Sequence, residues 1–251
     1  MKVSLIAIVS CSALVAYAQT FINGVTTPNV SADNKEALLK PYTYPNIPVV
    51  DFQSTDLICR SPDLADPNVE PFKIAGGETI TLRWDTKMKP GIGSSAISGP
   101  CSFWLAKASS KGTGPNWSKL NEFTYDGDAG KPDWCSYKLN RAGDNAYYEF
   151  KLPELVKGVY YLRAEIIDLN DAGKTNYDDF TMGSRSYASC LMIEITGDGT
   201  ETLKKLVDIM DAYKPYYKSK VLLGGNIGNA KFVYPGPVAP QKGPTNSLLK
   251  P

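Results

Sequence analysis

Short apolar segments, separated by glycine- and proline-rich turns, recur along the 251-residue chain. From Glu78 to Trp84 the apolar residues fall on every second position, which is the pattern of a strand with one buried face. Further candidate strands span residues 47–52, 102–107, 146–152, 158–169 and 187–196. Because no alternation of strands and helices accompanies them, we predict an all-β fold. The expected architecture is an antiparallel β-sandwich of the immunoglobulin or fibronectin type with long loops.

One segment between the last strand and the C-terminus has helical spacing. Thr202 could cap a helix in which Leu203, Leu206, Val207 and Met210 form an apolar stripe. A structured loop fits the same residues equally well, so both alternatives stay open.

The N-terminus has the features of a secretory signal peptide. Lys2 precedes the apolar run Val3–Val9, and Ala16-Tyr17-Ala18 is a small-x-small cleavage sequence. An uncleaved membrane anchor is the alternative, but the apolar run is short for a bilayer. We therefore predict a signal peptide over 1–18 and a secreted, extracellular protein that begins at Gln19, with no membrane partner.

The rest of the chain shows no internal repeat and no linker. One sandwich domain is therefore expected over residues 19–237. The residues after Pro237 are polar and include prolines, which predicts a flexible C-terminal tail over 238–251.

Four cysteines remain once Cys11 is removed with the predicted signal peptide, namely Cys59, Cys101, Cys135 and Cys190. An even number of cysteines in an exported protein indicates disulfides. Four cysteines allow three connectivities, and their spacing alone does not choose among them.

Two Asn-x-Ser sequons begin at Asn29 and Asn116. In an exported protein both are candidate glycosylation sites on surface loops. Such short motifs also arise by chance, so each needs its own test.

Charge and residue usage narrow the function classes. Removing residues 1–18 removes one lysine and no acid, so 26 basic residues balance 26 acidic ones. A neutral chain makes nucleic acid an unsuitable partner and suits an uncharged polysaccharide; we expect a monomer.

The chain contains no histidine, which excludes Ser-His-Asp and Cys-His catalysis. A glycosidase needs only two carboxylates, and Glu149, Glu165, Asp168 and Asp171 are available for that chemistry.

Seven segments resemble, in order, those of auxiliary activity family nine, formerly glycoside hydrolase family sixty-one, the fungal cellulose-active lytic polysaccharide monooxygenases. The clearest is Gly158–Ile167, which reads GVYYLRAEII and is similar to the family's G-x-Y-L-L-R-x-E-I-I strand. The others are residues 47–59, 74–84, 98–107, 186–190, 212–214 and 234–237. The resemblance implies a fibronectin-like sandwich with a flat binding face. It also implies a Cys59–Cys190 bridge, which leaves Cys101 with Cys135, a pairing that departs from the family's usual closely spaced pair.

The resemblance further implies one copper ion, held by an N-terminal histidine, a second imidazole and an axial tyrosine. A further histidine and a glutamine assist these ligands. Carried onto this sequence, the former copper-site positions are Gln19, Ile97, Asn170, Arg185 and Tyr187. Only the tyrosine is kept, so we predict no catalytic residues, no metal and no cofactor.

Tyrosine rings are the candidates for carbohydrate binding, since a ring can stack on the apolar face of a sugar. Tyr213 matches the family's flat-face tyrosine, and Tyr216 and Tyr217 follow it. We predict a secreted protein that binds polysaccharide, such as cellulose or hemicellulose, or the cell wall without oxidising it. The alternative is an active polysaccharide-degrading enzyme, either a copper oxygenase with a rebuilt site or a glycosidase. A structural wall protein without sugar affinity is a third class.

Overall fold

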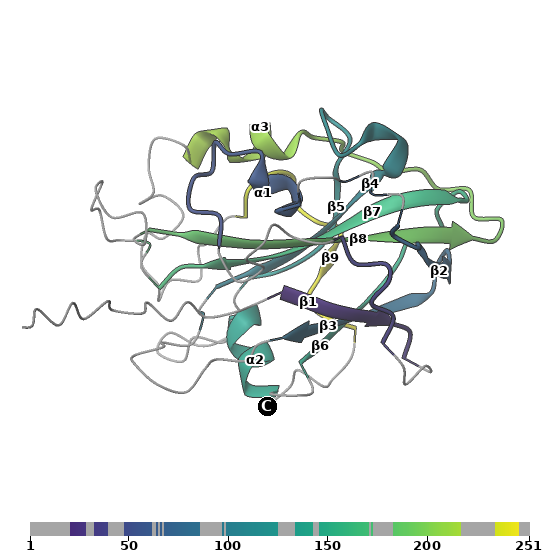
Figure 1. The fold of residues 1–251 in the computed structure, drawn as a ribbon, viewed down its shortest axis with the longest axis horizontal. Helices are drawn as coiled ribbons and strands as arrows, with labels where there is room; N and C mark the ends of the chain where they lie inside the picture. The colour runs from purple at the N-terminus through teal and green to yellow at the C-terminus, as the bar shows by residue number, and fades with distance from the viewer. Residues whose placement is uncertain are drawn as a thin grey trace, which may run out of the picture.

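Two β-sheets pack face to face in this computed structural model, and a layer of short helices covers the larger sheet (Figure 1). The structure describes residues 21–28, 33–39, 48–61, 64, 66, 68–85, 97, 99–124, 134–142, 146–170, 172, 183–216 and 234–245. The predicted signal peptide, Gln19 and Asn29 lie outside these residues.

The smaller sheet has three antiparallel strands in the order β1-β3-β6. These are β1 (Phe21–Thr26), β3 (Thr79–Asp85) and β6 (Tyr147–Lys151). Strands β3 and β6 agree with the sequence prediction to within a residue or two, because both alternate apolar and polar side chains.

The larger sheet has six strands in the order β2-β8-β7-β4-β5-β9. They are β2 (Phe72–Ala75), β4 (Cys101–Lys107), β5 (Ser118–Phe123), β7 (Gly158–Asp168), β8 (Arg185–Thr196) and β9 (Gln241–Lys242). The four central strands are antiparallel, as predicted, although no strand was predicted at β5. The two edge strands, β2 and β9, pair in parallel with their neighbours, which the sequence reasoning did not predict.

Strand β7 is buried on both faces, and its sequence is apolar except for Arg163, Glu165 and Asp168. Leu162, Ala164 and Ile166 face the smaller sheet and join the inter-sheet core. Tyr161 and Ile167 face the other way, into a second core beneath the helices. A strand buried on both faces reads as a continuous run, not as an alternation.

The outer layer consists of α1 (Asp56–Cys59), α3 (Ile209–Tyr213) and the 3₁₀ turns η1 (Ala108–Ser110) and η3 (Lys214–Tyr216). Figure 1 shows α1 and α3 on the side of the larger sheet that faces away from β1, β3 and β6. Trp104, Trp117 and Tyr213 fill the space between this layer and the sheet.

Both disulfides implied by the family resemblance are present. Cys59–Cys190 joins α1 to β8, with the two Cα atoms 5.3 Å apart. Cys101–Cys135 joins β4 to α2 (Cys135–Ala142), with a Cα–Cα distance of 5.7 Å.

The possible helix after Thr202 does not form over most of its length. Val207 pairs with Trp117 in a β-bridge, and the backbone oxygen of Lys204 accepts a hydrogen bond from Ser118 Oγ at 2.7 Å. These contacts hold the segment extended. The helix begins only at Ile209, where Asp208 Oδ1 accepts from Met210 N at 2.7 Å as the N-terminal cap.

The prediction of a flexible tail from residue 238 is wrong for residues 241–245. Gln241 and Lys242 form β9 on the edge of β5, and Thr245 N donates to Glu149 O of β6 at 2.8 Å. The sequence gives no alternating pattern there because a two-residue edge strand has no room for one.

Among the described residues, the helices are too short and too polar to cross a membrane.

Candidate functional site

Three of the positions that the resemblance assigns to the copper site lie at one end of the larger sheet, where β7 ends and β8 begins. In the β7–β8 register Asp168 pairs with Arg185 and Ile166 pairs with Tyr187. Asn170 follows β7 by two residues. Paired residues point to the same face of a sheet, so Arg185 and Tyr187 both lie on the face toward the smaller sheet.

The fourth position, Ile97, reaches the same end through the segment before β4. Ile167 N donates to Pro100 O at 3.1 Å, which fixes this segment against β7. Ser136 Oγ, on α2, accepts from Gly99 N and donates to Ile97 O, each at 2.8 Å. The structure therefore brings the four described positions to one end of the sandwich, while Gln19 lies outside the described residues.

Ile97 is only 1% exposed and packs in the inter-sheet core together with Tyr187. At the position where the resemblance places a metal-binding imidazole, this chain has an apolar side chain directed into the core. A branched alkyl group has no lone pair to offer a metal.

Tyr187 is fully buried. Burial raises the pKa of its phenol far above the ordinary value, and the nearby Asp168 carboxylate raises it further. The Arg60 guanidinium lies 5.9 Å from the centre of the tyrosine ring. Its Nε donates to Ala188 O at 2.6 Å, and burial lowers the pKa of Arg60 to about 10. The tyrosine is thus held as a neutral phenol beside a cation.

Arg185 forms an ion pair with Asp168, with 3.4 Å between Nη1 and Oδ2. The other oxygen of Asp168 accepts a hydrogen bond from Asn170 N at 3.0 Å. Both oxygens of the Asp168 carboxylate are therefore bound, one by Arg185 and the other by the backbone of Asn170. Within the described part of the chain, no group of three or more histidine, cysteine, aspartate or glutamate side chains is placed to hold a metal ion.

Tyr213 does not occupy the role predicted for it. Its side chain is fully buried, and its hydroxyl donates to Glu165 Oε2 at 2.5 Å. The ring packs edge-on against Phe52 at 5.6 Å. A ring without exposed surface cannot stack on a sugar, so this prediction is corrected. The side chain of Tyr216 and all of Tyr217 lie outside the described residues.

Glu165 is the centre of a buried network on the outer face of β7. Arg163 donates to both of its oxygens at 2.8 and 3.0 Å, and Ser186 Oγ donates at 2.5 Å. Burial would raise the pKa of Glu165, but the Arg163 charge and these hydrogen bonds bring it below its ordinary value.

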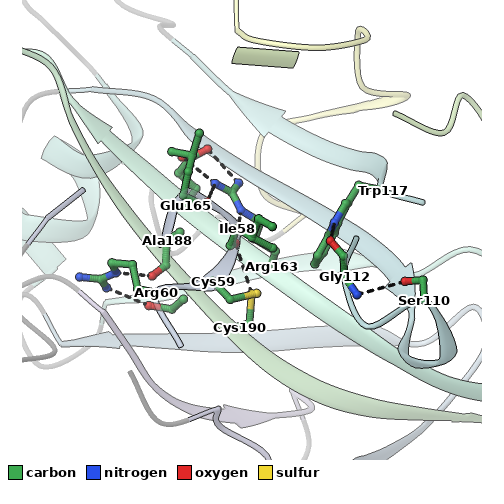
Figure 2. Close-up of a disulfide and its surroundings, with 12 residues drawn as sticks. Ile58, Cys59, Arg60, Ser110, Gly112, Trp117, Arg163, Glu165, Ala188 and Cys190 are labelled. Atoms are coloured by element: carbon green, nitrogen blue, oxygen red, sulfur yellow. Dashed lines mark hydrogen bonds and ion pairs between the residues drawn. A yellow bond between two sulfur atoms is a disulfide. The ribbon is translucent and has the colours of Figure 1, made fainter. Parts of the chain in front are cut away.

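The same guanidinium also holds α1. Arg163 donates to Ile58 O at 2.6 Å and Leu57 O at 2.7 Å, beside the Cys59–Cys190 disulfide (Figure 2).

The glycosidase alternative finds no support in the positions of Glu165 and Asp168. Glu165 and Asp168 lie three residues apart on one strand and thus on opposite faces of the sheet, so they cannot flank one glycosidic bond.

Sequence reasoning missed Arg60 and the pairing of Asp168 with Arg185. Nothing in the sequence marks Arg60 beyond its position after Cys59. The Asp168–Arg185 pair follows only from the register between β7 and β8. That register could not be predicted, because the sequence alone does not show which residues of two strands lie opposite each other.

Comparisons with known proteins agree with the resemblance. The sequence profile of Auxiliary Activity family 9, formerly GH61, matches residues 15–227. A curated AA9 family lytic polysaccharide monooxygenase A from Collariella virescens is 29% identical over 201 residues, which are 77% of this chain and 69% of that protein. A protein of the same name from Phanerochaete carnosa is 29% identical over 218 residues, 85% of this chain and 78% of that one. The chain spans 46% of a third relative, from Aspergillus fumigatus.

Solved structures show the same fold. The structure titled CvAA9A superposes with a TM-score of 0.71 at 26% identity and covers 88% of this chain and 97% of that chain. The extended catalytic domain of H. jecorina LPMO9A gives a TM-score of 0.66 at 23% identity over 88% of this chain and 91% of that one. From the profile match over most of its length, this chain belongs to Auxiliary Activity family 9.

Proposed function

We propose that this family member is a secreted protein that binds polysaccharide or cell-wall material and has lost copper-dependent oxidation. The observation that carries the proposal is the absence of histidine from the whole sequence. The names of its relatives describe lytic polysaccharide monooxygenases, and the resemblance assigns their copper to two imidazoles.

The groups at the β7–β8 end do not fit a copper ion. Copper in proteins is held chiefly by imidazole nitrogen or by sulfur ligands. This end offers a buried alkyl side chain at Ile97, a neutral phenol at Tyr187 and a guanidinium cation at Arg185. The fixed charge of Arg185 repels a cation and is already paired with Asp168. We therefore assign no oxidative step to these residues.

Polysaccharide binding remains as the function that the fold and charge support. The predicted mature chain has equal numbers of acidic and basic residues, which suits an uncharged ligand such as cellulose or hemicellulose. Tyr216 and Tyr217 are the remaining candidates for stacking on sugar rings. We propose that the protein acts as a monomer, outside the cell.

Binding to insoluble polysaccharides tests this proposal. The mature protein is mixed with cellulose, xylan, chitin and β-glucan, and the bound fraction is measured after washing. We expect retention on at least one glycan and weaker retention for Tyr217→Ala. Tyr147→Ala is the matched control, because Tyr147 is a half-buried tyrosine on β6 of the smaller sheet. No retention on any glycan would favour a structural wall protein.

A polysaccharide-degrading enzyme is the second candidate, and the family match itself favours it. Products released from cellulose and xylan are analysed with and without a reductant and cupric salt. Oxidised chain ends would reveal an oxygenase with a rebuilt site, and plain reducing ends a hydrolase. The absence of both is the expected result.

Secretion and glycosylation accompany this proposal. We propose that residues 1–18 are removed and that Asn116 carries a glycan. Asn116 lies in the turn between η1 and β5, is half-buried, and donates through Nδ2 to Thr113 O at 2.6 Å. From the register of β4 and β5 this turn is at the opposite end of the sheet from Tyr187. Mass spectrometry before and after enzymatic deglycosylation, with Asn116→Gln as the control, tests the assignment.

A further inference from the structure

The last described segment, Tyr234–Thr245, crosses from one sheet to the other, and we call it the C-terminal strap. Its β9 pairs in parallel with β5 of the larger sheet. Gln241 Nε2 donates to Lys151 O at 2.7 Å, and Thr245 N donates to Glu149 O at 2.8 Å, both on β6 of the smaller sheet. The strap, yellow in Figure 1, therefore joins the two sheets at an edge.

A lysine is completely buried beneath this strap. The side chain of Lys119 has no exposed surface, and its Nζ lies 2.9 Å from Glu122 Oε2. The same Nζ lies 4.8 Å from the ring centres of Trp104 and Tyr234. Tyr234 belongs to the strap, so the strap itself supplies one wall of the lysine's cage.

An irregularity in β5 creates this arrangement. Trp104 pairs with Lys119 and Phe103 pairs with Asn121, so Leu120 is an extra residue in the ladder. Side chains three apart on a regular strand point to opposite faces. The bulge turns Lys119 and Glu122 to the same outer face, which brings the amine and the carboxylate into contact.

Glu122 also holds the strap. Its second oxygen forms an ion pair with Lys242 of β9, so one carboxylate lies between two lysine amines and can balance the charge of only one of them. Asn121 Nδ2 adds a hydrogen bond to Gly243 O at 2.8 Å. A Cβ atom on Gly236 would lie 2.6 Å from the ring of Trp104, which shows how closely the strap lies on that ring.

If Lys119 and Lys242 are both protonated, Glu122 balances only one of the two positive charges. The other charged and titratable groups that face Lys119 do not balance the second one. Arg163 and Glu165 on β7 form their own ion pair, and Tyr213 on α3 and Tyr234 on the strap are neutral phenols whose pKa values are raised by burial. Burial lowers the pKa of Lys119 to about 7; Lys242 and Arg163 also lower it, while Glu165 opposes them.

We propose that the C-terminal strap is a pH-sensitive latch, released when the triad Lys119–Glu122–Lys242 takes up a proton. With the strap closed, Lys119 is kept out of water by the ring of Tyr234. With the strap lifted, the amine is hydrated and binds its proton more tightly. The open form therefore holds more protons than the closed form, and lower pH favours opening.

Release of the strap uncovers the ring of Trp104 and the edge of β5. An open strand edge and an exposed aromatic ring are surfaces through which a protein can bind a partner. This inference does not depend on the proposed function.

Hydrogen exchange on the mature protein tests the latch. The rates of the Gly243 and Thr245 amides are divided by their intrinsic chemical rates and compared with the Leu162 amide in the centre of the sheet. We expect opening of the strap to increase about tenfold or more as the pH falls from about 9 to about 6, while Leu162 changes much less. Equal behaviour of strap and centre would overturn the proposal.

Two substitutions locate the proton uptake. Lys119→Met keeps the length of the side chain and is expected to remove most of the pH dependence of strap opening. Glu122→Gln keeps the size and is expected to leave the strap more open at every pH. Lys73→Met is the control, since Lys73 is an exposed lysine on β2. A full pH dependence in a folded Lys119→Met would contradict the latch. If that variant does not fold, the comparison within the unsubstituted protein decides alone.

Discussion

Gly99 and Ile167 approach so closely that a Cβ atom on Gly99 would lie 1.6 Å from the carbonyl oxygen of Ile167. Ile167 N also donates to Pro100 O. The segment before β4 can therefore move neither toward β7 nor away from it. This contact holds the segment that carries Ile97 against the end of β7. It is the end of the sandwich to which the resemblance assigns the family's copper ligands.

Gly99→Ala is expected to destabilise the fold strongly. Backbone must move to admit the new methyl group, and overpacking of a tight site costs about 1–3 kcal/mol or more. Gly76→Ala is the matched control, because its Cβ atom would meet its nearest neighbour, Leu155 N, at 3.2 Å. Urea unfolding measures both variants. Equal stability of the two would show that the Gly99 contact is not a constraint.

Glu165→Leu should be among the most damaging single substitutions. It leaves the Arg163 charge buried without a partner, and breaking a buried ion pair in this way costs about 3–5 kcal/mol. Replacing both residues, as in Arg163→Met with Glu165→Leu, should cost less than Glu165→Leu alone. As a control, Glu194→Leu breaks an exposed contact of 3.9 Å with Lys73 and should change stability by less than about 1 kcal/mol. A small effect of Glu165→Leu would refute the assigned role of the network.

Removal of the Cys101–Cys135 disulfide should loosen the tie between α2 and the segment that carries Ile97. The cysteines are 34 residues apart, and loop-closure entropy predicts a loss of about 3–4 kcal/mol for the double alanine variant. The Cys59–Cys190 bridge spans 131 residues, so its removal should cost about 1 kcal/mol more. Chemical denaturation of both variants checks the order. A reversed order would point to strain or to structure in the unfolded chain.

Stability should rise with pH on the alkaline side because of Lys119. The pKa of Lys119 is lowered by burial to about 7 in the folded protein, while the unfolded chain keeps the ordinary value near 10.5. Between these values the unfolded state binds more protons, so folding becomes more favourable as the pH increases. Contact with Glu122 offsets part of this effect. The difference in unfolding free energy between the natural protein and Lys119→Met, measured from neutral to alkaline pH, should show this rise. Parallel pH profiles would exclude it.

Much of the sandwich could be predicted from the sequence because its central strands carry strong patterns. β3 alternates apolar side chains, and β7 is a long segment rich in tyrosine and isoleucine, so both were located to within a residue or two. Strands β2 and β9 were missed because they are short and take their place from pairing with β8 and β5. Strands β1 and β5 were missed too, because their sequences FINGVT and SKLNEF mix polar and apolar residues without a clear alternation. The helix after Thr202 was wrongly allowed because the β-bridge between Trp117 and Val207 comes from a distant part of the chain.

The positions at the β7–β8 end were placed by resemblance, and their surroundings could not be predicted. The absence of histidine is visible in the sequence alone. The burial of Ile97 and the pairing of Arg185 with Asp168 depend on strand register and on the close approach at Gly99. Tyr213 was misassigned because a tyrosine that packs on a buried carboxylate and one that faces solvent look alike in a sequence.

Copper binding by the mature protein, with Gln19 as its first residue, tests the central claim most directly. Cupric ion is titrated into the metal-free protein by calorimetry, and the electron paramagnetic resonance spectrum of the mixture is recorded. Loss of the imidazole ligands predicts no tight binding step and only the spectrum of loosely held copper. One tightly bound equivalent with a defined spectrum would contradict the account.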